Sequence, residues 1–489
     1  MAAHARVRHM PYMRDKMPHM PASSSSTRKR AARRPDWIAD FTDNGKARYL
    51  QIVDLIERAV ADGKLNPGDR LPPQRKLAEM VGVDLTTVTR GFAEAHRRNL
   101  IESRGPLGTF IAPPKATFLQ QVDLSMNIPP PPADLDLAVL LKRGLSQVLV
   151  RSDIDLLMTY QLGGGSDTDR QAGAAWLAPI LGRVDPSRVI VTPGAHSALA
   201  ALILSLTRPD APIFTEQLIY PGLPLIVRQL GRALGAIACD EYGMRPDALD
   251  EACARARGGV IYLNPTIRNP TAQTMPAQRR KDILAVAARW NVPVVEDDPY
   301  WLFADSPPAP LAALAPQQVY YLSTLSKCIS PGLRAAFLVL PVAGAQEAFL
   351  KALRSLSLMS PPLTTSLVTQ WILEGTATEV LTGILKESRE RLLAASQILS
   401  SVNMAGSGGA IHVWQPLPAH WAAQSLAAAA RTEGLVVAPS SAFCQSGDVP
   451  NAIRISLGGC TRRTELNSAL RKLAQLVARK SSDEDRLLI

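Results

Sequence analysis

Short apolar runs alternate with amphipathic stretches through the middle of this chain, and this alternation most constrains its fold. Runs at 189–191, 212–214 and 260–263 have the length of buried strands, and stretches such as 198–206 and 279–290 have the length of helices. Alternation of this kind predicts an α/β fold, with a mainly parallel mixed sheet and helices on both faces. Ligands of such sheets bind at the carboxyl ends of the strands, so we look for chemistry there.

Length and composition set the remaining limits. The chain has 489 residues, which at roughly 150 residues per domain allows about three folding units. Its 46% apolar and 20% charged residues argue against a chain that is disordered throughout and against a fibrous one. No run reaches the roughly 18 apolar residues of a membrane span. The five cysteines are scattered and lack paired metal-ligand spacing, so we expect a cytoplasmic protein without a metal site.

Most of the positive charge lies in the first 35 residues. The chain carries a net charge of +11, and this segment holds nine basic residues and one acid. It lacks apolar periodicity, so we expect a disordered basic tail at 1–35 that could hold phosphates nonspecifically. We favour the simpler alternatives, which are a dispensable extension or a true start at one of its internal methionines.

Three helices and a hairpin are expected in residues 45–112. Apolar residues recur there at three- and four-residue spacing, Pro72 and Pro73 favour a helix start, and Asp84 is a plausible N-cap. The expected elements are helices at 47–62, 74–80 and 85–98 and strands at 100–103 and 109–112. Because a small structural bundle would show the same pattern, the pattern alone is weak evidence for DNA binding.

The sequence motifs of this segment strengthen the case for DNA binding. GDRLPPQRKLA at 68–78, followed by VGV at 81–83 and TTV at 86–88, resembles the winged helix-turn-helix of the GntR regulator family. The resemblance implies double-stranded operator DNA as a partner, with the third helix in the major groove. The implied DNA contacts are Arg70, Arg75, Thr86, Thr87 and Gly108, and we add Arg90 because it lies on the opening turns of the third helix. Leu85 and Thr89 stand where the family often has arginine, which leaves the operator sequence open.

Short motifs follow the expected strands of the larger segment in a fixed order. They are TPGAH at 192–196, NPT at 269–271, EDDPY at 296–300, STLSK at 323–327, SPGLR at 330–334 and NAIR at 451–454. A lone lysine such as Lys327 is usually a surface charge, so the inference rests on the whole set. In this order and spacing the motifs resemble fold-type-I aminotransferases, which use pyridoxal 5′-phosphate (PLP), across about residues 123–477.

This resemblance implies a role for each residue around the cofactor ring. Lys327 would form the Schiff base, which requires that part of the lysine be deprotonated. Asp297 would hold the ring nitrogen protonated and so make the ring an electron sink. Tyr300 and Asn269 would bond the ring hydroxyl oxygen, and Tyr220 would stack on the ring face.

The same resemblance implies an anion site and a second subunit. The implied phosphate contacts are Gly194, Ala195, His196, Thr324, Ser326 and Arg334, at the start of a helix. Arg454 would bind a ligand carboxylate bidentately. Tyr160 resembles the tyrosine that reaches the phosphate from a neighbouring subunit, which implies a dimer. Ala272 departs from the usual Asn-Pro-Thr-Gly and would be awkward if that position requires a positive φ.

A GntR-like winged helix joined to an aminotransferase-like domain resembles the MocR (GabR-like) transcriptional regulators, which are typically head-to-tail dimers. The expected organisation is the basic tail at 1–35, a DNA-binding domain at 45–112, a semi-rigid linker at 113–121 and a PLP-binding domain at 122–480. Within the last, we expect a large part at about 165–340 and a small α+β part at about 345–480.

The expected function is PLP-dependent control of amino-acid, amine or vitamin B6 metabolism genes, in the cytoplasm and on the nucleoid when bound to DNA. An amino compound would displace Lys327 as an external aldimine, engage Arg454 and reposition the winged helices. Two alternatives stay open: an active aminotransferase with a vestigial winged helix, and a module that senses PLP itself.

Overall fold

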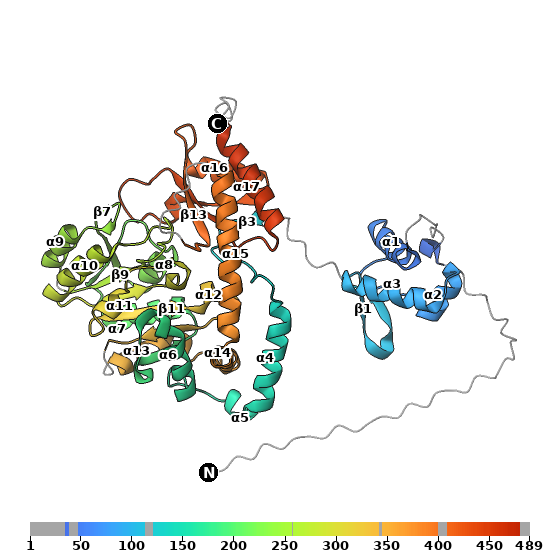
Figure 1. The fold of residues 1–489 in the computed structure, drawn as a ribbon, viewed down its shortest axis with the longest axis horizontal. Helices are drawn as coiled ribbons and strands as arrows, with labels where there is room; N and C mark the ends of the chain where they lie inside the picture. The colour runs from blue at the N-terminus through green and yellow to red at the C-terminus, as the bar shows by residue number, and fades with distance from the viewer. Residues whose placement is uncertain are drawn as a thin grey trace, which may run out of the picture. The chain divides into compact units, whose positions relative to one another are not determined.

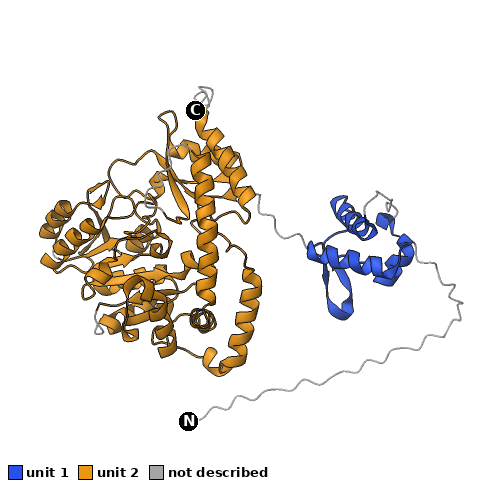
Figure 2. Cartoon of the chain, viewed as in Figure 1, with its two compact units in different colours: residues 1–118 blue, residues 119–489 orange. Residues whose placement is uncertain are grey.

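The computed structural model describes residues 35–38, 47–112, 121–256, 258–341, 345–399 and 408–479. The chain divides into two compact units, residues 1–118 and residues 119–489, which Figure 2 distinguishes by colour. Each unit has its own apolar core, and each is described by itself. The expected basic tail, apart from Pro35, and the expected linker, apart from Gln121, lie outside the described residues.

The first unit contains the three predicted helices and the predicted hairpin (Figure 1). Its elements are α1 (Arg48–Ala61), α2 (Gln74–Val81), α3 (Leu85–Arg97), β1 (Ile101–Ser103) and β2 (Thr109–Ile111). The predicted N-cap is also confirmed, because the Asp84 carboxylate accepts the backbone N–H of Thr87 at 2.8 Å. Ile52, Val88 and Phe92 lie in the buried core between the helices. The sequence pattern therefore predicted this unit to within one residue at each end.

The second unit is built on a seven-stranded sheet in the order β4-β12-β11-β10-β9-β5-β6. The strands are β4 (Val189–Thr192), β5 (Pro212–Thr215), β6 (Ala233–Ala236), β9 (Val260–Leu263), β10 (Val294–Asp297), β11 (Val319–Thr324) and β12 (Ala336–Val339). Strand β12 runs antiparallel to both of its neighbours, and the other pairs are parallel. This confirms the mainly parallel mixed sheet.

Helices cover both faces of this sheet because its strands are apolar on both sides. Along β4, Ile190 packs in one buried cluster and Val189 and Val191 pack in another. The helices that pack on the Ile190 face are α7 (Ala195–Leu206), α8 (Gly222–Gln229) and α13 (Gln346–Ser357). The opposite cluster includes residues of α6 (Asp167–Leu181), α9 (Pro246–Arg255), α10 (Ala277–Arg289) and α14 (Pro362–Leu373).

A smaller part follows the long helix α15 (Thr376–Ile398), which runs through the middle of the view in Figure 1. Its three-stranded antiparallel sheet has the order β13 (His412–Pro416), β16 (Ala452–Ser456) and β15 (Ala438–Pro439). Helices α16 (Ala423–Thr432) and α17 (Arg463–Ala478) pack in the same buried cluster as this sheet.

The start of the second unit is joined to this smaller part. Strand β3 (Val122–Asp123) pairs in parallel with β14 (Leu435–Val436), just before β15. Gly458 and Gly459 follow β16, and a methyl group on either glycine would lie within about 2 Å of a carbonyl oxygen of residue 128 or 123. The two glycines therefore allow residues 122–128 to lie directly against the end of β16.

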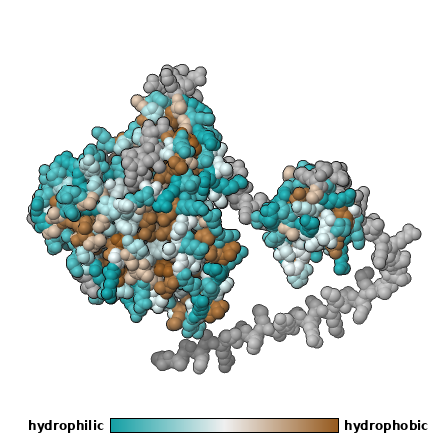
Figure 3. All heavy atoms as spheres, in the orientation of Figure 1, coloured by the Kyte–Doolittle hydropathy of each residue, from teal (hydrophilic) through white to brown (hydrophobic). Residues whose placement is uncertain are grey.

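Helix α4 (Leu137–Arg151) and the short helix α5 (Ile154–Leu157) carry apolar side chains on the surface of this unit. Figure 3 shows hydrophobic residues gathered in this region. Val150 is 85% exposed and Met158 is 82% exposed, so both apolar side chains are almost fully accessible to solvent. Within the described ranges, helices are too short or too polar to cross a bilayer.

Candidate cofactor and ligand site

The motifs of the large segment meet at one edge of the seven-stranded sheet. Asp297 ends β10, and Lys327 lies in the short helix α12 (Leu325–Cys328) that directly follows β11. Asn269 lies in the loop after β9, and Gly194 lies between β4 and α7. These positions are the carboxyl ends of parallel strands, where the topology predicted a ligand site.

Lys327 is mostly enclosed, and the pKa of its amine is lowered. Burial and the nearby Arg454 guanidinium together lower the pKa of Lys327 to about 8, while Asp297 opposes the shift. Its Nζ donates to the backbone carbonyl of Asn127. A lysine with this pKa is partly unprotonated near neutral pH, which is the state that a nucleophilic amine requires.

Asp297 is a buried carboxyl group with one side-chain donor. Burial raises the pKa of Asp297 to about 6, while a hydrogen bond from the Tyr262 hydroxyl and the charge of Lys327 hold it down. The Tyr262 Oη lies 2.8 Å from Asp297 Oδ2. Above about pH 6 the carboxylate is therefore ionised and can face a cation.

The flanking acids Glu296 and Asp298 point elsewhere. Glu296 accepts the backbone N–H groups of Leu311 and Ala312 at 2.9 and 2.8 Å. Asp298 accepts the Thr266 hydroxyl at 2.9 Å, and burial with the nearby Glu296 carboxylate raises its pKa. Asp297 is thus the acid of this run that lies with Lys327.

Three other predicted site residues form hydrogen bonds with polar groups: Arg454, Asn269 and Tyr300. Arg454 is 6% exposed, and its Nη1 donates to Asn269 Oδ1 at 2.7 Å. Its guanidinium lies 4.9 Å from the Phe443 ring centre, and its Nε lacks a partner among the described residues. The Tyr300 hydroxyl accepts Asn127 Nδ2 at 2.7 Å.

An anion cradle lies at the start of α7. Gly194 precedes the helix at φ 91°, and a methyl group there would lie 2.7 Å from Arg334 Nη2. Ala195 and His196 open the helix, whose first N–H groups lack partners within it. The Thr324 hydroxyl donates to Ser326 Oγ at 3.1 Å on the neighbouring turn. Exposed guanidinium, free N–H groups and hydroxyls together suit a phosphate.

Residues 122–127 complete the site and were missed by the sequence analysis. The backbone carbonyl of Ser125 accepts Arg454 Nη2, and the carbonyl of Asn127 accepts Lys327 Nζ. The Asn127 side chain also lies 3.1 Å from His412 Nδ1, and burial with the nearby Arg454 lowers the pKa of His412 to about 3. No sequence signal marks these contacts, because they join residues 200 or more positions apart in the chain.

The two tyrosines that the sequence analysis placed at the cofactor, Tyr220 and Tyr160, are half-buried and exposed. Tyr220 is half-buried just before α8, and its hydroxyl interacts electrostatically with Asp297 and Arg334. Tyr160 is 74% exposed, so its ring is not enclosed by its own chain. Ala272 has φ 58°, the left-handed conformation in which an alanine is strained.

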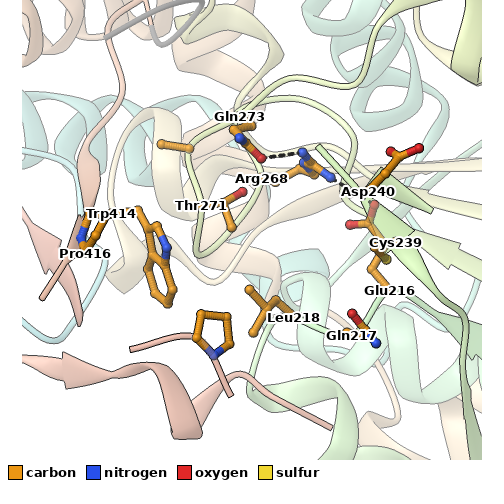
Figure 4. Close-up of a pocket in the computed structure, with 12 residues that line it drawn as sticks. Glu216, Gln217, Leu218, Cys239, Asp240, Arg268, Thr271, Gln273, Trp414 and Pro416 are labelled. Atoms are coloured by element: carbon orange, nitrogen blue, oxygen red, sulfur yellow. Dashed lines mark hydrogen bonds and ion pairs between the residues drawn. The ribbon is translucent and has the colours of Figure 1, made fainter. Parts of the chain in front are cut away.

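A cavity of about 460 Å³ borders this site (Figure 4). Arg268 and Glu216 form a buried ion pair of 3.1 Å on its wall, and Arg268 also donates to Gln273 at 2.7 Å. Trp414 and Leu218 supply apolar wall. Because Arg268 directly precedes Asn269, the same loop contributes to the cavity wall and to the contact with Arg454.

The predicted DNA contacts lie on the surface of the first unit, with two exceptions. Arg70, Arg75, Thr86 and Arg90 are exposed, and Thr87 and Gly108 are half-buried. The Thr87 hydroxyl donates to Asp84 Oδ2 at 2.6 Å, so it is available only as an acceptor. Arg90 lies over the Tyr49 ring, with its guanidinium carbon 4.9 Å from the ring centre.

Arg70 and Gly108 approach each other at the hairpin. A methyl group on Gly108 would lie 3.0 Å from Arg70 Nε, and Arg70 forms an isolated bridge with Phe110. The hairpin tip is thus held close to an exposed cation, as the wing of a winged helix requires for contact with DNA backbone.

The fold and the lysine-centred site define an aminotransferase-like protein with a helix-turn-helix unit. The model of the family "Aminotransferase class I and II" matches residues 120–473, and the chain belongs to this family, whose members are PLP-dependent. The model of "Bacterial regulatory proteins, gntR family" matches residues 48–111, so the first unit is a GntR-type helix-turn-helix domain.

Proteins named as HTH-type transcriptional regulators are similar to this chain. The uncharacterized HTH-type transcriptional regulator YdeF of Bacillus subtilis is 25% identical over 451 residues, 90% of this chain and 96% of that protein. The HTH-type pyridoxine biosynthesis transcriptional regulator PdxR of Corynebacterium glutamicum is 28% identical over 302 residues, 60% of this chain and 65% of that protein.

Aminotransferases are also similar to the second unit. The 2-aminoadipate transaminase of Thermus thermophilus is 29% identical over 345 residues, 67% of this chain and 85% of that protein. The crystal structure of LysN, an alpha-aminoadipate aminotransferase of Thermus thermophilus, has a TM-score of 0.65 at 25% identity and covers 73% of this chain and 92% of its own. That structure is a complex with N-(5′-phosphopyridoxyl)-L-leucine.

Proposed function

We propose that this protein is a PLP-dependent DNA-binding transcriptional regulator of the MocR type, which responds to PLP, an amino compound or both. The fusion of a GntR-type domain with an aminotransferase-like domain supports this proposal, as do relatives named HTH-type transcriptional regulators. PdxR is named for pyridoxine biosynthesis, and we extend the proposal to genes of vitamin B6, amino-acid or amine metabolism on that basis.

The residues present fit PLP. An open cradle beside Gly194, an enclosed amine of lowered pKa on Lys327 and a buried carboxylate on Asp297 match its phosphate, its aldehyde and its ring nitrogen. When bound, PLP supplies an aldehyde that a lysine amine can capture and a ring that withdraws electrons from an attached amino compound.

Each residue of the chain has its own task in this proposal. Lys327 supplies the neutral amine, and Asp297 keeps a proton on the ring nitrogen. Tyr300 and Asn269 bond the ring hydroxyl oxygen, and Tyr220 lies against the ring. The phosphate is held by the cradle residues, which are Gly194, Ala195, His196, Thr324, Ser326 and Arg334.

One observation carries the regulatory part of the proposal. Arg454 and Lys327, the two groups that would engage a carboxylate and an amine, are both hydrogen-bonded to carbonyls of residues 122–127. A ligand carboxylate at Arg454 competes with the Ser125 carbonyl for the same guanidinium. The segment that is displaced is continuous with the stretch that connects to the DNA-binding unit, so ligand binding changes the attachment of that unit.

A dimer is part of the proposal. Tyr160 is 74% exposed and follows α4 and α5 in the chain, a stretch that carries exposed apolar side chains such as Val150 and Met158. An apolar surface of this kind marks a protein interface. In a head-to-tail homodimer, Tyr160 of the partner subunit would reach the phosphate.

The alternative is an aminotransferase with a vestigial winged helix. Two observations favour keeping it: the lysine, aspartate and arginine are all in place, and a transaminase is 29% identical to this chain. The two functions differ in whether specific DNA binding or multiple turnover responds to PLP.

The test is binding to DNA from upstream of the gene, measured by fluorescence anisotropy with and without PLP and a panel of amino acids. We expect PLP to change the affinity of the wild type and of Lys351→Ala, an exposed lysine on α13. Lys327→Ala should lose both this response and the visible absorbance of bound PLP. Rapid turnover with an amino acid and a 2-oxo acid, without specific DNA binding, would favour the enzyme instead.

A matched pair of arginine variants tests the DNA-binding unit in the same assay. Arg75→Ala removes an exposed cation from α2 and should weaken specific binding roughly 5- to 100-fold. Arg97→Ala removes an equal charge from the far end of α3, where Glu94 already neutralises it, and should have little effect. Equal losses in the two variants would mean that charge alone, and not position, drives binding.

A further inference from the structure

Two residues at the end of strand β9 contact the residues of the proposed cofactor site: Tyr262 lies in the strand, and Asn264 directly follows it. Tyr262 and Asn264 are two positions apart, so they lie on the same side of the extended chain. Asn264 Nδ2 donates to the Asp297 carbonyl at 2.7 Å, and Asn264 Oδ1 accepts the backbone N–H of Asn269 at 2.8 Å. The Asn264 amide therefore ties Asp297 to Asn269 through their backbones.

Tyr262 acts on the side chain of Asp297 instead. Its hydroxyl donates to Asp297 Oδ2 at 2.8 Å, and both residues are at most 7% exposed. Among the described residues, Tyr262 provides the side-chain hydrogen bond that this carboxylate accepts. A buried carboxylate without donors tends to take up a proton, because burial disfavours the charged form.

Other titratable groups surround Asp297 without donating to it in the described part of the chain. Lys327 favours the ionised carboxylate by its charge. Tyr220, Tyr300 and Asp298 also interact with it electrostatically. Lys327 acts on this carboxylate through its charge alone, whereas the Tyr262 hydroxyl donates a hydrogen bond to it directly.

We propose that Tyr262 is a positioning residue that keeps Asp297 ionised and thereby holds a proton on the ring nitrogen of bound PLP. This inference rests on the proposed binding of PLP. Asp297 and the ring nitrogen share one proton, which lies on the nitrogen when the carboxylate is the weaker base. The hydrogen bond from Tyr262 weakens the carboxylate as a base, so removing it returns the proton to Asp297 and leaves the ring neutral.

The test uses Tyr262→Phe in the full-length protein, loaded with PLP that is isotope-labelled at the ring nitrogen. The nitrogen NMR shift reports directly whether the ring is protonated. We expect a protonated nitrogen in the wild type and a shift toward the unprotonated value in Tyr262→Phe. A nitrogen that stays fully protonated in the variant would overturn the proposal.

Tyr321→Phe is the matched control. Tyr321 is a fully buried tyrosine of strand β11, which pairs with β10 on the side opposite to β9. Its hydroxyl lacks a partner among the described residues. Removing this hydroxyl costs the core as much volume as Tyr262→Phe does, but it leaves Asp297 untouched. The control should keep the wild-type nitrogen shift, and an equal change in both variants would count against a specific role for Tyr262.

A second measurement needs no cofactor. In the PLP-free protein, the carboxyl carbon of Asp297, assigned with Asp297→Asn, should titrate near pH 6 in the wild type. In Tyr262→Phe its midpoint should rise by about 1 to 2 units, the size expected for a hydrogen bond to a charged group. An unmoved midpoint refutes the role of Tyr262, whereas a wild type that takes up no PLP refutes the proposed function itself.

Discussion

At the scale of single residues, the site is organised around charges that burial would otherwise suppress. Lys327 and Asp297 are shifted in opposite directions, the amine toward neutrality and the carboxyl group toward protonation. Both shifts arise mainly from burial, and neighbouring charges adjust them. Groups tuned in this way are typical of sites that carry out covalent or proton-transfer chemistry.

The lowered pKa of Lys327 predicts the pH dependence of PLP uptake. Only the neutral amine can react, so below pH 8 the rate should rise about tenfold per pH unit, and it should level off above pH 8. Stopped-flow absorbance after mixing with PLP measures this rate. A lysine with an ordinary pKa would give a rate that keeps rising to about pH 10.

Arg454→Gln provides the control for this interpretation. The Arg454 guanidinium is one of the causes of the lowered pKa, so its removal should move the break in the profile to higher pH. An unchanged break would show that Arg454 does not contribute to the lowered pKa of Lys327.

The sequence motifs identified individual residues but not their supports. Lys327, Asp297 and Arg454 could be identified from the sequence because each lies within a short motif typical of the family. Asn127 and Tyr262 could not, because each acts through a contact with a residue distant in the chain. Ala272 was noted as a departure from glycine, and its positive φ shows that the backbone keeps its conformation despite the methyl group.

At the scale of elements, strand β3 is the least expected part of the fold. The alternation of apolar runs predicted β4, β5 and β9 of the large sheet, because nearly every residue of these three strands is apolar and buried. It could not reveal that β12 is antiparallel, or that two residues at 122–123 pair with β14. Such pairings depend on partners far away in sequence, which periodicity does not report.

Hydrogen exchange can test whether β3 responds to ligand. The N–H groups of Val122 and Leu124 donate to Gly434 and Val436 at 2.9 and 2.8 Å. With PLP and an amino acid that alters its visible absorbance, peptides covering 122–127 should exchange roughly tenfold faster, since the bonds from Arg454 and Lys327 are lost.

The centre of β10 should keep its protection in the same experiment, because it lies within the sheet. Arg454→Gln should remove the ligand effect on 122–127. Unchanged exchange in the wild type would argue against this segment as the responsive element.

At the scale of the whole molecule, the proposed dimer requires an interface that the surface of one subunit must provide. The apolar side chains on α4 and α5 need a partner, and Tyr160 has its proposed role only across an interface. Val150→Glu and Met158→Glu place charges in that surface and should shift the protein to monomers in sedimentation velocity. Leu225→Glu, at an apolar site of α8 that is 57% exposed, should leave the assembly unchanged.

PLP affinity should follow assembly. The monomeric variants lack Tyr160 of the partner subunit at the phosphate, so they should bind PLP roughly 10- to 100-fold more weakly. Tyr160→Phe should give a similar loss while remaining dimeric. Monomers that bind PLP as tightly as the wild type would remove the phosphate role from this tyrosine.

The close fit of Gly458 and Gly459 against residues 122–128 has a consequence for protein engineering. In the proposed mechanism, residues 122–128 link ligand binding to the DNA-binding unit, so a DNA-binding unit transplanted at residue 113 onto another aminotransferase would lack this link. The transferable cassette must include the stretch through 128 together with a pair of side-chain-free positions to receive it. The segment to be transplanted therefore extends past the boundary between the two units and includes strand β3.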